Sequence, residues 1–134
     1  MKKLIFVMAL LLLAGCTPKE EKPDVKEIKI YDFEDFMPDE NGEENPKPII
    51  ITDEKEISVL VELGGLKSDY KDWKKDNYEG INSYWVDFGN GMIVGMYDDI
   101  DYCMFCEYAG EPYGGPYYKT PKGFREKIIE IMEK

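Results

Sequence analysis

Residues 84–97, YWVDFGNGMIVGMY, decide the fold because two strand-forming runs flank a turn signal. Tyr, Trp, Val, Phe and Ile favour a pleated, half-buried surface. Asn90 and Gly91 suit the two central positions of a type I′ turn, where both residues need positive φ. The stretch therefore predicts a β-hairpin with a loop of two or three residues, and it leaves the strand register open.

The segments after this hairpin continue the sheet and end in a helix. The residue pattern of 102–108 alternates from one face to the other, which predicts a third antiparallel strand. Residues 110–121, rich in Tyr, Gly and Pro, are expected to form a loop. Thr120 is expected to cap the last helix, with Pro121 in its first turn. The apolar stripe expected on this helix is Phe124, Ile128, Ile131 and Met132.

The segments before the hairpin predict two more strands and a loop. Residues 27–36, EIKIYDFEDF, alternate as a strand does, although acids weaken the pattern at its end. Residues 37–48 collect proline, glycine and acids, as a mobile loop does. The apolar run Ile49–Ile51 is consistent with a buried strand.

A second amphipathic helix is expected to begin at Asp53. Asp53 and Glu56 have the spacing of a capping box, and Gly64-Gly65 ends the apolar periodicity. The buried face is expected to contain Ile57, Leu60, Val61 and Gly64. Residues 67–80 are compatible with either a short helix or an irregular loop.

Together these elements predict an α+β fold for a single small domain, residues 27–134. The expected order is β-β-α-β-β-β-α, a small antiparallel sheet with two helices packed on one face. The chain of 134 residues has room for one core of this size.

Charge and composition exclude several functions. The chain has 17 basic and 28 acidic side chains, no histidine and a formal charge of −11. Such a surface repels a phosphate backbone, so no nucleic-acid partner is expected. The lack of histidine removes the Ser-His-Asp triad, histidine-ligated metal sites and the usual general base near neutral pH.

The N-terminus has the features of a secretory signal. Lys2 and Lys3 precede an apolar run that is too short to span a bilayer, and the run ends in Leu13-Ala14-Gly15-Cys16. This lipobox resembles that of bacterial lipoprotein precursors. The resemblance implies a signal peptide over residues 1–15, cleavage before Cys16, and diacylglycerol on the Cys16 thiol.

That resemblance also implies a location. The protein would be attached by its lipid to a membrane of the cell envelope, on the extracytoplasmic side, with residues 16–26 as a lipidated tether. Loss of the two signal lysines leaves 15 basic and 28 acidic residues, which gives the processed chain a formal charge of −13.

Cys103 and Cys106 form a C-x-x-C pair that is open to three interpretations: packed thiols, a structural disulfide, or a redox pair. In a strand, the two side chains would point to opposite faces with Cα atoms about 10 Å apart. A disulfide needs less than about 7 Å. A bridge therefore requires a turn at this place.

No metal or other cofactor is expected. The C-x-x-C pair supplies half of a zinc site, and no histidine can complete it. Asp98, Asp99 and Asp101 could hold a cation loosely, but solvated turn acids are the more economical interpretation.

Aromatic residues around a Gly- and Pro-rich loop are candidates for ligand contacts. Tyrosine in such loops offers a large contact area at small entropic cost, although the same rings can also cover a small core. The candidates are Trp73, Trp85, Tyr113, Tyr117 and Tyr118.

The sequence thus favours a membrane-anchored, extracytoplasmic, non-catalytic binding or interaction module, without an assembled set of catalytic residues. A protein, a peptide or a cell-wall glycan would be its ligand. Two alternatives are a thiol redox protein that uses Cys103 and Cys106, and an inhibitor or immunity-type protein.

Overall fold

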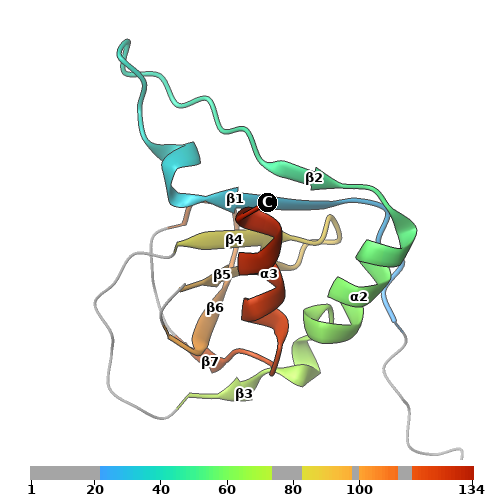
Figure 1. Cartoon of the computed structure of the whole chain (residues 1–134). Coiled ribbons are helices and arrows are strands. Elements are labelled where there is room, and N and C mark those ends of the chain that lie inside the picture. Colours follow the sequence, from blue (N-terminus) through green and yellow to red (C-terminus); the bar gives the residue numbers. More distant parts are fainter. Residues whose placement is uncertain (1–21, 74–82, 98–99, 112–115) are drawn as a thin grey trace, which may run out of the picture.

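A computed structural model describes residues 22–73, 83–97, 100–111 and 116–134, which form a mixed α+β domain (Figure 1). The described strands are β1 (Ile28–Asp32), β2 (Ile49–Ile51), β3 (Lys71–Asp72), β4 (Tyr84–Asp87), β5 (Ile93–Met96), β6 (Tyr102–Cys106) and β7 (Tyr118–Lys119). Two α-helices, α2 (Glu54–Gly64) and α3 (Phe124–Met132), and two 3₁₀ turns, η1 (Phe33–Phe36) and η2 (Lys67–Asp69), complete it.

The strands form one antiparallel sheet in the order β2-β1-β4-β5-β6-β7-β3. The α+β class is confirmed, but the sheet has seven described strands where five were expected, so the element order differs from the prediction. The additional strands, β3 and β7, have two residues each. Strands of two residues are too short to show a periodic pattern in the sequence. They are defined by their pairing, because β3 pairs with β7 and β7 pairs with β6.

The hairpin of β4 and β5 is present, but its predicted turn is wrong. The strands end at the pair Asp87↔Ile93, and the Phe88 amide donates to the Met92 carbonyl at 3.1 Å, which closes a loop of three residues, 89–91, within the expected length. Positive φ occurs at Gly89 (76°) and Gly91 (87°) and not at Asn90. Side chains stabilise this loop, because Asp87 Oδ1 accepts from the Gly89 amide at 2.8 Å and Asn90 Oδ1 from the Met92 amide at 3.2 Å.

The first predicted strand, residues 27–36, ends early, at Asp32. Asp32 and Asp35 form a reciprocal capping box, in which each carboxylate accepts the other's amide N–H at 3.0 Å. These bonds favour the 3₁₀ turn η1 over continued pairing. The acids that weakened the strand pattern are therefore the residues that end it.

The two helices follow the predicted apolar stripes, with one corrected boundary. Asp53 caps α2, accepting the Glu56 amide at 2.9 Å. Helix α3 begins at Phe124 and not near Pro121, with Gly123 (φ 87°) as its N-cap. Thr120 instead directly follows β7, and its amide donates to the Asp101 carbonyl at 3.1 Å.

Both helices pack on one face of the sheet, which we call the helix-side face. A row of register partners, Ile30, Val86, Val94 and Phe105, crosses this face from β1 to β6. Ile57, Leu60 and Val61 of α2 and Phe124, Ile128 and Ile131 of α3 complete the same core. The helices meet where Gly64 approaches the Phe124 ring.

The opposite, loop-side face has a smaller core beneath η1 and the loop residues around Ala109 and Tyr117. Trp85, Met104 and Cys106 are buried there, and the partly buried side chains packed on them are Tyr31, Phe36, Ile93, Ala109 and Tyr117. The indole of Trp85 donates to the Glu111 carbonyl at 3.0 Å. The sheet is therefore covered on both faces.

Strand β2 is correct as a strand but wrong as a buried one. It lies at the edge of the sheet, with β1 on one side, and Figure 1 shows it along the upper margin. Of its side chains only Ile51 is buried, since Ile49 and Ile50 are 38% and 54% exposed.

Candidate functional site

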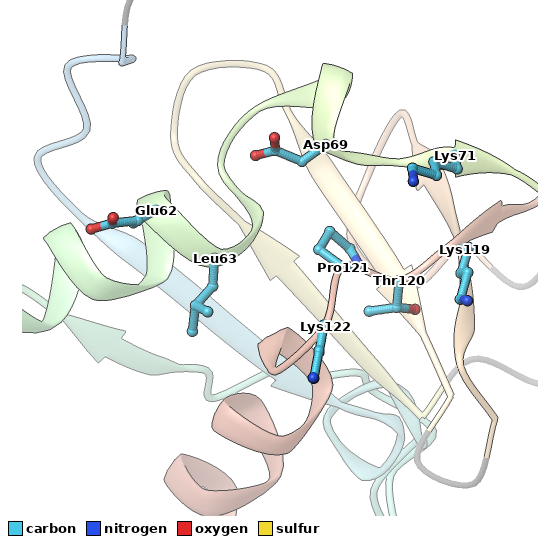
Figure 2. Close-up of a pocket in the computed structure, with 8 residues that line it drawn as sticks. All are labelled: Glu62, Leu63, Asp69, Lys71, Lys119, Thr120, Pro121 and Lys122. Atoms are coloured by element: carbon cyan, nitrogen blue, oxygen red, sulfur yellow. The ribbon is translucent and has the colours of Figure 1, made fainter.

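A cavity of about 420 Å³ lies where α2, η2, β3, β7 and the approach to α3 meet (Figure 2). We call it the lysine cleft. Its lining is Glu62, Leu63, Asp69, Lys71, Lys119, Thr120, Pro121 and Lys122. Three positive and two negative side chains give this lining a positive formal balance in a chain whose formal charge is −11.

Strand pairing brings two of the lysines together. Lys71 of β3 and Lys119 of β7 are register partners. Directly opposed residues have Cβ atoms about 4.5–5.5 Å apart, and like charges in such a pair are destabilising. Both side chains are exposed, and within the described residues neither lies within 4.0 Å of an acid.

Lys122 adds a third cation from the connection between β7 and α3. It is also exposed and, among the residues that the structure covers, it forms no ion pair. The positive end of the α3 dipole follows immediately, because that helix begins at Phe124. Gly123 gives α3 no side-chain capping bond.

The two acids come from the other wall. Glu62 belongs to α2 and Asp69 to η2, and Figure 2 shows the Glu62 carboxylate on the helix side of the cavity, opposite Lys71 and Lys119 on the strand side. The cleft is thus bipolar. A ligand with an anionic group could place it among the lysines, and a cationic group could lie toward Glu62 and Asp69.

The two cysteines lie away from the lining of this cleft and on opposite faces of β6. Cys103 contributes to the helix-side core and Cys106 to the loop-side core, and both are free thiols. Burial raises the pKa of each thiol to about 12. Thiolate is the reactive form, so both groups are poor nucleophiles at neutral pH.

The predicted aromatic contacts are divided between the two faces. Tyr118 packs against Phe105 on the helix-side face, with ring centroids 4.9 Å apart, whereas Trp85 is 1% exposed in the loop-side core. Trp73 and Tyr117 come together through Tyr102, with centroids 5.2 Å from it in each case. These residues act in packing, and none lines the lysine cleft.

Other expected sites have separate outcomes. Cys16, Tyr113, Asp98 and Asp99 lie outside the described residues. Asp101 forms an ion pair with Arg125 at 3.3 Å. Within the described part of the chain, no group of three or more His, Cys, Asp or Glu side chains could hold a metal ion.

No protein family, curated protein or solved structure matches this chain. Among the described helices, none is long and apolar enough to cross a bilayer.

Sequence reasoning missed the lysines of the cleft. Lys71 and Lys119 are far apart in the chain and become neighbours through the pairing of β3 with β7. No local pattern marks them. The one available signal is the pair Lys119 and Lys122 beside Pro121, two cations within a short stretch of a strongly acidic chain.

Proposed function

We propose that this chain is a lipoprotein of the cell envelope, anchored through Cys16, whose domain of residues 27–134 is a non-catalytic binding module. The ligand binds in the lysine cleft through an anionic group, a carboxylate or a phosphate. The observation that carries this proposal is the cavity itself, whose lining joins Lys71 of β3 to Lys119 and Lys122 of residues 119–122, all three without an ion-pair partner among the described residues.

The energetics support a binding role. Two lysines opposed across paired strands cost stability, and a site where a local rule is broken at a cost is often a functional site. An anion between them would convert repulsion into charge-assisted hydrogen bonds. Of the expected ligand classes, a peptide fits the bipolar lining best, because it can present a carboxylate to the lysines and an amine to Glu62 and Asp69.

Binding is tested by NMR titration of the full chain in detergent with three probes: trialanine, its C-terminal amide, and inorganic phosphate. We expect trialanine to shift the amide resonances of Lys119, Thr120 and Lys122, and its C-terminal amide, which lacks the carboxylate, to bind about fivefold more weakly. Phosphate binding as tight as that of trialanine would identify phosphate as the chemistry recognised. If neither anion shifts these resonances, the assignment of the cleft is wrong.

A matched pair of variants locates the binding. Lys119→Gln with Lys122→Gln should weaken anion binding about fivefold, because two of the three positive charges of the lining are lost. Lys55→Gln with Lys134→Gln removes the same two charges from exposed positions outside the cleft and should leave binding unchanged. Equal losses in both variants would mean that net charge, and not the cleft, controls binding.

Anchoring is tested separately. The full chain expressed in a bacterial host should partition with the membrane fraction and take up labelled palmitate. Cys16→Ser should abolish the label, because the lipid is expected on the Cys16 thiol. Unchanged labelling of Cys16→Ser would refute lipidation at Cys16, and it would leave the proposal of ligand binding in the lysine cleft unaffected.

A further inference from the structure

The two edges of the sheet differ in their protection. At one edge, β3 has two residues, Lys71 and Asp72, which are both charged and exposed. Short, charged strands are a common protection against pairing with another chain. At the other edge, β2 exposes Ile49 and Ile50, so this edge presents apolar side chains beside backbone groups that no second strand of the described residues pairs with.

The sequence around β2 has a charge pattern that is complementary to itself. Residues 47–53 read KPIIITD, with Lys47 three positions before Ile50 and Asp53 three positions after it. Both charged side chains are exposed. If two copies pair antiparallel about Ile50, then Lys47 of each copy lies opposite Asp53 of the other, and Ile50 lies opposite Ile50.

Local structure holds both ends of this stretch in place. The Lys47 amide donates to Asp35 Oδ1 at 3.0 Å, and Asp53 Oδ1 accepts the Glu56 amide as the cap of α2. The charge of Asp53 is therefore fixed at the end of the strand. A twofold pair uses each of these contacts twice, as isologous interfaces do.

We propose that β2 is a self-association surface, at which two copies of this chain pair antiparallel in the register that places Ile50 opposite Ile50. The pairing would join the two sheets through their β2 edges and cover the exposed isoleucines. It is independent of the ligand bound in the lysine cleft. The formal charge of −11 opposes association at long range, so the dimer should strengthen as salt screens this repulsion.

A cysteine placed at the twofold position tests the register. Opposed residues have Cβ atoms about 4.5–5.5 Å apart, close to the separation in a disulfide. We expect the full chain with Ile50→Cys to form disulfide-linked dimers under mild oxidation about tenfold faster than Val59→Cys. Val59 is the matched control, because it is 44% exposed on α2 and both variants retain every native cysteine.

Two further variants separate this register from chance collision. Ile49→Cys should cross-link more slowly than Ile50→Cys, because its opposite residue in this register is Ile51 and not a second cysteine. In the Ile50→Cys chain, Lys47→Glu should slow cross-linking more than Lys134→Glu, which makes the same charge change at the exposed C-terminus. Equal cross-linking rates at positions 50 and 59 would overturn the proposal, as would capture of Ile50→Cys only by a different protein.

Discussion

The thiol of Cys103 lies on the helix-side face of β6 and that of Cys106 on the loop-side face, and burial raises the pKa of both from an ordinary value near 9 to about 12. Each thiol therefore stays neutral in the folded state at pH values where it ionises in the unfolded chain. Their contribution to stability is complete below about pH 9 and is lost as the pH rises toward 12.

This difference predicts a steeper loss of stability in alkali for the parent chain than for a variant with Cys103→Ala and Cys106→Ala. The free energy of unfolding from urea titrations at pH 7, 9 and 10 gives the two slopes. Tyrosines and lysines titrate in both proteins, so the difference between the slopes isolates the thiols. Equal slopes of unfolding free energy against pH in the two proteins would show that burial does not raise the pKa values of these thiols.

Gly64 is a second residue whose effect depends on packing. A Cβ added there would lie 2.6 Å from Cδ1 of the Phe124 ring. Alanine gains about 1 kcal/mol in helix propensity over glycine, but overpacking in a core costs about 1–3 kcal/mol. We expect the cost of the clash with Phe124 to exceed the gain in helix propensity, so that Gly64→Ala lowers the free energy of unfolding measured in urea.

A double-mutant cycle identifies the cause. In a Phe124→Leu background the ring is absent, and Gly64→Ala should be neutral or stabilising. If Gly64→Ala costs the same in both backgrounds, the ring contact is not responsible, and the helix end itself disfavours alanine.

Among the elements, η1 organises the loop that follows it. Asp35 accepts the Asp32 amide through Oδ2 and the Lys47 amide through Oδ1, each at 3.0 Å. One carboxylate thus joins the end of β1 to the segment that leads into β2.

Asp35→Ala should release this segment. Hydrogen bonds to charged groups contribute about 1.5–3 kcal/mol, so exchange of the Lys47 amide with deuterium should accelerate about tenfold or more. Glu34→Ala is the control, because it removes a neighbouring acid that makes neither of these bonds. An unchanged Lys47 exchange rate in Asp35→Ala would show that other contacts hold the loop.

The elements also show how far the sequence determines the fold. The stripe and cap of α2 are local features, and both were predicted. The start of α3 was predicted too early, because the Thr120 amide bonds to Asp101, a residue distant in the chain, and no local cap signal reports that. The lysine cleft was unpredictable for the same reason, since pairing of β3 with β7 creates it.

The aromatic residues show a different limit of sequence-based prediction, because a local pattern suggests a ligand site that the structure does not form from them. The sequence suggests Tyr117, Tyr118 and Trp85 as candidate ligand contacts, yet in the structure they pack on the two faces of the sheet. A sheet that has helices on one face requires other chain segments to cover the second one, and aromatic rings cover large areas. Composition cannot separate a ring that covers a core from one that meets a ligand.

For the whole molecule, the excess of acidic side chains is expected to control how stability depends on salt. With 28 acidic and 17 basic side chains, the folded chain repels itself, and salt screens this repulsion. We expect Tm to rise by a few degrees, about 2–5 °C, between low salt and physiological ionic strength.

A variant with Glu43→Lys and Glu44→Lys checks the origin of this rise. Both residues are exposed in the loop of residues 37–48, so the fold should tolerate the change. Since its net charge is less negative, the variant should show a smaller increase of Tm with salt. An equal or larger increase would point to general salt effects on burial and not to self-repulsion.

The strand order of the sheet has a consequence for how the chain reaches its native state. Strands β4, β5 and β6 pair with their neighbours in sequence and can form early, because short loops close at low entropic cost. Strand β1, which is made before all of them, must wait for β4 to complete its second row of hydrogen bonds. Until the central meander of β4, β5 and β6 exists, β1 can pair only with β2, so Ile28 and Ile30, which are fully buried in the folded domain, lack most of their core in that interval.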